Sequence, residues 1–214
     1  MFLLILAAAQ QAIALPVLRS GSLEPDFKAA MNEGGAASVK VKLQVSPEGV
    51  PERCDIAFSN GPQANGERLC AMLLAKAGYS PPSARSAKPV AGVVFVWSQW
   101  SKGRWLGSRP PPWDPVDLAL EVDKIPAGFR ETDMFHLRVA ADETGRVREC
   151  EVEETRLAAQ AKALLCHEVG LETIPPAVDP TGAATASVRP VRVRLTSADF
   201  NRKLMRDLRR GRTR

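Results

Sequence analysis

The first regular pattern of hydrophobic and polar residues in the chain is a strict alternation from Val39 to Val45. Such alternation is typical of a β-strand that buries one face. A turn with the sequence Pro47-Glu48-Gly49 follows, and residues 50–58 then return as a second apolar stretch. The pattern predicts a β-hairpin that ends at Ser59-Asn60-Gly61-Pro62.

A helical pattern occupies residues 65–77, where apolar residues recur on one face. The stripe consists of Leu69, Cys70, Leu73, Leu74 and Ala77. Gly78 and the pair Pro81-Pro82 cannot continue a helix, so we expect the helix to end there. The run of β-branched and small residues from Val90 to Val96 then predicts a third strand.

The same order of patterns returns in the second part of the chain. Alternation over residues 135–140, a turn at Glu143-Thr144-Gly145 and a return over residues 147–152 predict another hairpin. Residues 157–169 predict a helix, and residues 186–195 predict a last strand. In that strand the apolar and basic side chains alternate, as Val191, Arg192, Val193, Arg194 and Leu195.

We therefore predict an α+β fold of two repeated β-β-α-β units, each with a helix packed on a small antiparallel sheet. The units span residues 34–100 and 131–197. Residues 15–33 form a leader and residues 101–130 a linker rich in Pro and Trp. Residues 198–214 form a basic C-terminal tail.

The four cysteines support an internal duplication. Cys54 and Cys70 are sixteen positions apart, as are Cys150 and Cys166, and the second pair follows the first by ninety-six positions. Four cysteines allow three pairings, of which the duplication selects one disulfide within each unit. Zinc binding and redox catalysis are the alternatives, but both favour close C-x-x-C pairs, which this spacing does not supply.

The N-terminus resembles an export signal over residues 1–14. Residues 2–9 form a short apolar core, and Ala12-Ile13-Ala14 supplies a small-x-small cleavage pattern. Export signals usually have a basic residue before the apolar core, and this segment has none. The alternatives are therefore a start assigned at the wrong position or a weak membrane anchor. Export and paired cysteines together predict a soluble protein of an oxidising periplasmic compartment.

The positive charge of the chain lies at its C-terminus. The net charge is +5, whereas residues 201–214 alone carry +6, which leaves −1 for the rest. Such a tail suits an anionic surface of the cell envelope, or it is a solvated terminus that aids solubility.

Each unit resembles the C-terminal domain of TonB, the periplasmic end of the energy transducer for outer-membrane transport receptors. The residues that carry the resemblance are Pro47-Glu-Gly-Val50, Ser59-Asn-Gly61 and Tyr79-Ser-Pro-Pro82 in the first unit, and Glu143-Thr-Gly-Arg-Val147 and Ile174-Pro-Pro-Ala177 in the second. The resemblance implies a partner-binding edge on the last strand of each unit, residues 90–96 and 186–195. A receptor's extended segment would add there as a further strand. The alternative is that the units pair with each other or that a lid covers these edges.

The four tryptophans of the chain, Trp97, Trp100, Trp105 and Trp113, lie within seventeen residues. Together with neighbouring basic residues they could bind envelope glycans or a protein partner, or pack the linker against the two units. His136 and His167 lie in no nucleophile motif, and phosphate-loop, zinc-protease and serine-hydrolase motifs are missing from the sequence.

These observations predict a non-enzymatic periplasmic protein-binding module with no cofactor, no metal and no nucleic acid partner. We expect binding through Val191, Arg192, Val193, Arg194, Trp97, Trp100 and Trp105. The alternative is a scaffold that docks on peptidoglycan or an anionic surface through the Trp-rich linker and the basic tail.

Overall fold

The computed structural model describes residues 12–19, 37–86, 89–101, 104–107, 116–125, 129–130, 133–199, 202 and 206. The helices are α2 (Gln63–Lys76) and α3 (Ala159–Leu171). The strands are β1 (Ala37–Val45), β2 (Pro51–Asn60), β3 (Ala91–Ser101), β4 (Arg104–Gly107), β5 (Leu118–Val122), β6 (Met134–Ala141), β7 (Val147–Val152), β8 (Ala177–Val178), β9 (Ala184–Thr185) and β10 (Ser187–Ser197).

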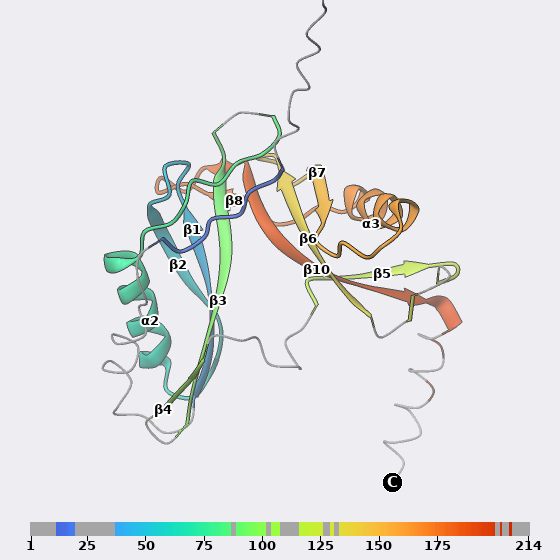
Figure 1. Ribbon diagram of the computed structural model, residues 1–214. Helices are drawn as coiled ribbons and strands as arrows, with labels where there is room; N and C mark the ends of the chain where they lie inside the picture. Colours follow the sequence, from blue (N-terminus) through green and yellow to red (C-terminus); the bar gives the residue numbers. More distant parts are fainter. Residues whose placement is uncertain are drawn as a thin grey trace, which may run out of the picture.

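The main strands form one sheet of eight strands rather than two separate sheets (Figure 1). Its central order is β2-β1-β3-β10-β6-β7, with β4 added to β3 and β5 added to β10. The sheet is mixed, because β10 runs parallel to β3 and β5 but antiparallel to β6. A short hairpin of β8 and β9 forms a second sheet.

The predicted fold class of two repeated β-β-α-β units, each with its own small antiparallel sheet, is therefore wrong. The described chain is mostly β, and all its strands except β8 and β9 share a single mixed sheet. The joint is a parallel pairing of Ala91 with Ser187 and of Gly92 with Val188. Two separate three-stranded sheets would have four unpaired edges. Pairing β3 with β10 covers one edge of each sheet and leaves two.

The two helices lie on opposite faces of this sheet. Residues that are direct neighbours across paired strands share a face. Val45, Gly92 and Val188 are such neighbours, and Val45 packs in the core under α2. Ala141 neighbours Ser187 on the other face and belongs to the core under α3. Each helix therefore buries a different side of the sheet.

The helical pattern predicted for the first part of the chain is found in α2. Leu69 and Leu73 are buried against the apolar face of β1, and Cys70 is joined to Cys54 of β2 with a Cα–Cα distance of 5.4 Å. Gly66 permits this close packing, since a Cβ there would lie 2.6 Å from the side chain of Ile56.

The second half contains the matching arrangement. Leu165 and Val169 of α3 are fully buried, and Cys150 of β7 is joined to Cys166 with a Cα–Cα distance of 5.5 Å. Both predicted disulfides are confirmed. Each one ties a helix to the second strand of a hairpin.

The halves are also connected on the face that α3 covers. The Nε2 of Gln44 in β1 donates to the carbonyl of Val178 in β8, and the Val178 N–H donates back to the Gln44 Oε1 at 3.0 Å. Gln44 is only 3 % exposed. The buried Gln44 amide thus links β1 to the β8–β9 hairpin through a pair of hydrogen bonds with the Val178 backbone.

None of the helices in the described part of the chain has the length and hydrophobicity needed to cross a membrane.

Candidate functional site

The neighbouring strands β3 and β10 separate soon after they meet, which Figure 1 shows as two strands diverging from the joint. They pair only at Ala91–Ser187 and Gly92–Val188. Farther along, β3 takes β4 as its neighbour and β10 takes β5. We call the space between the separated strands the fork.

The edge of β3 that faces the fork keeps some of its hydrogen-bonding groups available. The Ala91 N–H donates to the Ala186 carbonyl at 3.1 Å, away from β1. Because backbone direction alternates along a strand and the β1–β3 register is continuous, the backbone groups of Val93 and Phe95 also point into the fork. The parallel pair Gly92–Val188 uses the Val93 N–H, and among the described residues no strand pairs with β3 at Phe95.

The corresponding edge of β10 is closed. The Arg192 N–H donates to the Asp117 Oδ2 at 2.8 Å, and the Asp117 N–H donates to the Arg192 carbonyl at 2.9 Å. Pro190 has no N–H to offer, and β5 pairs with residues 193–197. An added strand would have to displace these groups, so β3 is the more accessible edge.

A cavity of about 420 Å³ lies in the fork. Lys42 and Phe95 are direct cross-strand neighbours on the face that α3 covers, the face that also carries Arg189 and Val191. The walls are mainly apolar and are completed by the chain that follows α3. The lining residues are Lys42, Phe95, Asp117, Leu118, Thr173, Ile174, Pro175, Arg189, Pro190 and Val191.

Two basic side chains at this cavity are withdrawn from water. Arg189 is 7 % exposed, and its Nη2 donates to the Pro175 carbonyl at 2.6 Å. Burial lowers the pKa of Arg189, and the nearby Asp117 carboxylate opposes that shift. The pKa of Lys42 is lowered by burial and, to a smaller degree, by the positive charge of Arg189.

The buried guanidinium is incompletely satisfied. Within the described part of the chain, the Arg189 Nε has no hydrogen-bond partner. Asp117, the acidic residue at the cavity, is already engaged with the Arg192 N–H and lies 3.4 Å from the Arg192 Nε. The cavity is therefore lined by two cationic side chains, Lys42 and Arg189, and by one carboxylate, that of Asp117, which is hydrogen-bonded to Arg192.

The partner-binding residues predicted on β10 are divided between two faces. Val191 and Val193 are 2 % and 0 % exposed and pack in the core under α3. Arg192 and Arg194 point to the other face, and Arg192 pairs with Asp117. The prediction that these four residues bind a partner remains untested.

The predicted tryptophan site is not an exposed aromatic surface. Trp97 and Trp100 are 4 % and 3 % exposed, and Trp97 packs on Phe58 with ring centroids 5.7 Å apart. Lys40 Nζ lies 4.7 Å above the Phe95 ring and 5.6 Å above the Trp97 ring. The Trp105 side chain, Trp113 and most of the tail lie outside the described residues.

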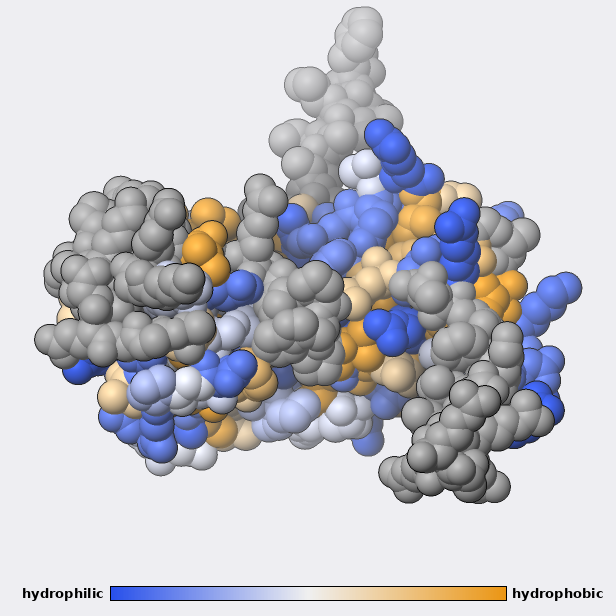
Figure 2. Space-filling view, turned by 90° about the horizontal axis from the view of Figure 1, so that it is seen from below, coloured by the Kyte–Doolittle hydropathy of each residue, from blue (hydrophilic) through white to orange (hydrophobic). Residues whose placement is uncertain are grey.

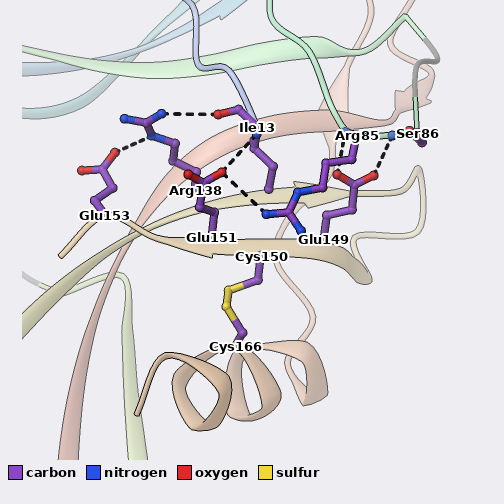
Figure 3. A network of polar contacts seen from close by, with 9 residues as sticks. All are labelled: Ile13, Arg85, Ser86, Arg138, Glu149, Cys150, Glu151, Glu153 and Cys166. Carbon is purple, nitrogen blue, oxygen red and sulfur yellow. Dashed lines mark hydrogen bonds and ion pairs between the residues drawn. A yellow bond between two sulfur atoms is a disulfide. The ribbon is translucent and has the colours of Figure 1, made fainter. Parts of the chain in front are cut away.

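A separate polar cluster on β7 holds the N-terminal segment (Figure 3). The Glu151 carboxylate accepts a hydrogen bond from the Ile13 N–H at 3.1 Å and lies 3.8 Å from the Arg85 guanidinium. Glu149 accepts from the backbone N–H groups of Arg85 and Ser86 at 2.7 and 3.0 Å. These carboxylates have a structural use in joining three distant segments.

The same cluster bears on the predicted export signal. Ile13 is fully buried beside Ala140 and Val188, and Ala14 exchanges two backbone hydrogen bonds with Ser83 at 2.9 and 3.0 Å. Cleavage after Ala14 would remove Ile13 from this core. Residues 1–11 lie outside the described residues, so the signal itself remains a prediction.

The predicted surface histidine on β6 takes part in a local hydrogen bond. The His136 Nδ1 lies 3.2 Å from the Glu154 Oε1, and the His136 side chain is 54 % exposed. No group of three or more potential metal-ligating side chains occurs among the residues that the structure describes.

Sequence reasoning missed the cavity because its residues come from five separate segments. Lys42 occupies a polar position in a strand of alternating apolar and polar residues. From that pattern alone, its side chain would be expected to face solvent. Asp117 and Leu118 fall in the predicted linker, where β5 was not expected. Pro190 is the one residue in the sequence that could have indicated the fork, because a proline within a strand pattern indicates a strand edge without ladder hydrogen bonds.

Comparison with models of protein families, with curated proteins and with solved structures yields no match to this chain.

Proposed function

We propose that this protein is a non-enzymatic periplasmic binding protein that captures an extended segment of an outer-membrane transport receptor, as its resemblance to TonB C-terminal domains implies. The segment adds as a strand to β3 at Phe95. The observation that carries the proposal is the accessible edge of β3 beside a cavity able to accept side chains.

The outer edges of the sheet are less suited to this function. The edge strand β2 carries charged side chains such as Arg53 and Asp55 and has two register irregularities against β1. Charges and bulges protect an edge from pairing. At the opposite end, Glu149 and Glu151 of β7 already hold other segments of this chain.

The alternative of an envelope-docking scaffold receives less support. Trp97 and Trp100 are buried and cannot stack on a glycan without unfolding β3. On the face seen from below, apolar surface is broken up by hydrophilic side chains (Figure 2). Scattered apolar residues of this kind are ordinary on a protein surface.

In-cell photo-crosslinking tests the proposal. A benzoylphenylalanine residue at Phe95 should crosslink to an extended receptor segment, identified by mass spectrometry, whereas the same residue at Arg53 on β2 should not. Receptor crosslinks from Arg53 but not from Phe95 would exclude strand addition at β3.

A further inference from the structure

We infer that the fork cavity recognises a carboxylate, namely an acidic side chain of the captured segment, through Arg189 and Lys42. This inference deepens the proposed function and rests on it for the identity of the ligand. The carboxylate binding itself can be measured without any peptide capture.

The first reason is an unmatched donor on a side chain that lines the cavity. Arg189 is 93 % buried, since 7 % of it is exposed, yet its Nε has no partner among the described residues. Buried polar groups in native proteins are nearly always hydrogen-bonded. A ligand oxygen would complete the guanidinium, whose Nη2 already donates to the Pro175 carbonyl.

The second reason is the local charge. Lys42 and Arg189 are close enough for the charge of Arg189 to act on Lys42. Asp55, the acid that acts on Lys42, is 3.1 Å from the Arg53 guanidinium, and Asp117 is engaged with Arg192. Two cations and one carboxylate at the cavity leave an excess of one positive charge.

The charge and the walls together select the kind of anion. An excess of one charge suits a monoanion better than a doubly charged phosphate, whose desolvation needs more donors. The walls include Phe95, Leu118 and Ile174 and accommodate the methylene groups of an acidic side chain. A carboxylate can accept from the guanidinium and the ammonium at once.

The third reason is the position of the cavity relative to the β3 edge. Phe95 belongs both to the edge that receives the segment and to the cavity wall. Side chains of an added strand alternate between the two faces of the sheet. A residue placed opposite Phe95 on the face covered by α3 therefore projects toward Lys42 and Arg189.

NMR titration of the full chain tests the inference with N-acetyl-glutamate amide as the probe and N-acetyl-glutamine amide as its uncharged control. The carboxylate probe should shift the Arg189 Nε–H resonance in a saturable way, and the glutamine probe should not. Arg189→Gln and Lys42→Gln should each weaken binding at least tenfold. Arg148→Gln, which changes a basic side chain that pairs with Asp142 and does not line the cavity, should leave binding unchanged.

Equal shifts from both probes, or equal weakening by Arg148→Gln, would overturn the inference. If Arg189→Gln does not fold, Lys42→Gln and the Arg189 resonance of the natural chain still decide the result. Crosslinks from Phe95 without carboxylate binding would retain strand capture and reject this inference. Carboxylate binding without receptor crosslinks would retain the inference and reject strand capture.

Discussion

The strands β3 and β10 occupy equivalent places in the two halves, since each follows a helix that is tied by a disulfide to a hairpin. Their sequences and their surroundings differ. The fork edge of β10 is closed by Pro190, Asp117 and β5. The fork edge of β3 presents the backbone of Phe95. Two strands in matching places along the chain therefore have unlike edges, because different segments lie beside them.

The halves agree most closely in the turns of their hairpins. Gly49 and Gly145 have φ values of 90° and 83°. The Gly49 carbonyl accepts from the Tyr79 N–H at 3.0 Å, and the Gly145 carbonyl accepts from the Ile174 N–H at 2.9 Å. In each half the turn is therefore fixed to the segment that leaves the helix.

The joint between the halves provides the test with the largest expected effect. Ile13→Ala removes a fully buried side chain that contacts Ala140 and Val188. We expect a loss of about 2–5 kcal/mol in the free energy of unfolding. Urea denaturation measures it, with Val17→Ala, at a 65 % exposed position, as the control. A loss below 0.5 kcal/mol, of the order seen at surface sites, would contradict a structural role for residues 12–19.

Removal of each disulfide compares the halves directly. Replacing Cys54 and Cys70 by Ala, or Cys150 and Cys166 by Ala, should cost about 3 kcal/mol in either case, because both bridges close loops of the same length. Thermal unfolding of the two variants measures this cost. Because the halves share a sheet, each variant should still unfold in one transition. Two separated transitions would show that the halves are independent.

The turn glycines give a smaller effect. A Cβ at Gly49 would lie 2.3 Å from the Tyr79 carbonyl oxygen, and one at Gly145 would lie 2.1 Å from the Ile174 carbonyl oxygen. Together with the positive φ, each Gly→Ala change should cost about 1–3 kcal/mol. Gly170→Ala is the control, since nothing lies within 4 Å of a Cβ there. Denaturation midpoints that match the control would refute the turn geometry.

The smallest expected effect is a difference in how the hairpin turns of the two halves respond to pH. The Asp142 carboxylate accepts from the Thr144 hydroxyl, from the Arg148 guanidinium and from the N–H groups of Arg146 and Thr144, which holds its pKa well below the usual value. In the first half Ser46 occupies the corresponding place, and its hydroxyl accepts from the Glu48 and Val50 N–H groups at 3.2 and 3.3 Å.

Because the folded pKa of Asp142 is lowered, its stabilisation is present above the ordinary value of 3.8 and is lost as the pH falls toward the lowered one. The Val50 N–H donates to an uncharged hydroxyl, which in turn donates to the Glu48 carboxylate at 2.7 Å. Hydrogen exchange of the Arg146 N–H should therefore lose more protection than that of the Val50 N–H on acidification below about pH 4, beyond the change in intrinsic rate. Asp142→Asn should remove this difference. Equal pH responses in the two turns would contradict it.

Local features were predictable because they depend on near neighbours in the chain. The alternation over Val39–Val45 and the stripe through Leu69 and Leu73 predicted a strand and a helix that the structure contains. The register of the four cysteines predicted both disulfides. β5 was not predicted, because its five residues lie in a segment that prolines and tryptophans identify as a linker.

The sequence by itself determined the hairpins, the helices, the turn glycines and the pairing of the cysteines, since periodicity and spacing encode them. Only the tertiary structure decided that the halves share one sheet, because an alternating strand does not specify which strand lies beside it. The tertiary structure also decided the position of the cavity. Lys42, Asp117 and Arg189 are far apart in the chain, and they meet only because β3 and β10 pair briefly and then separate.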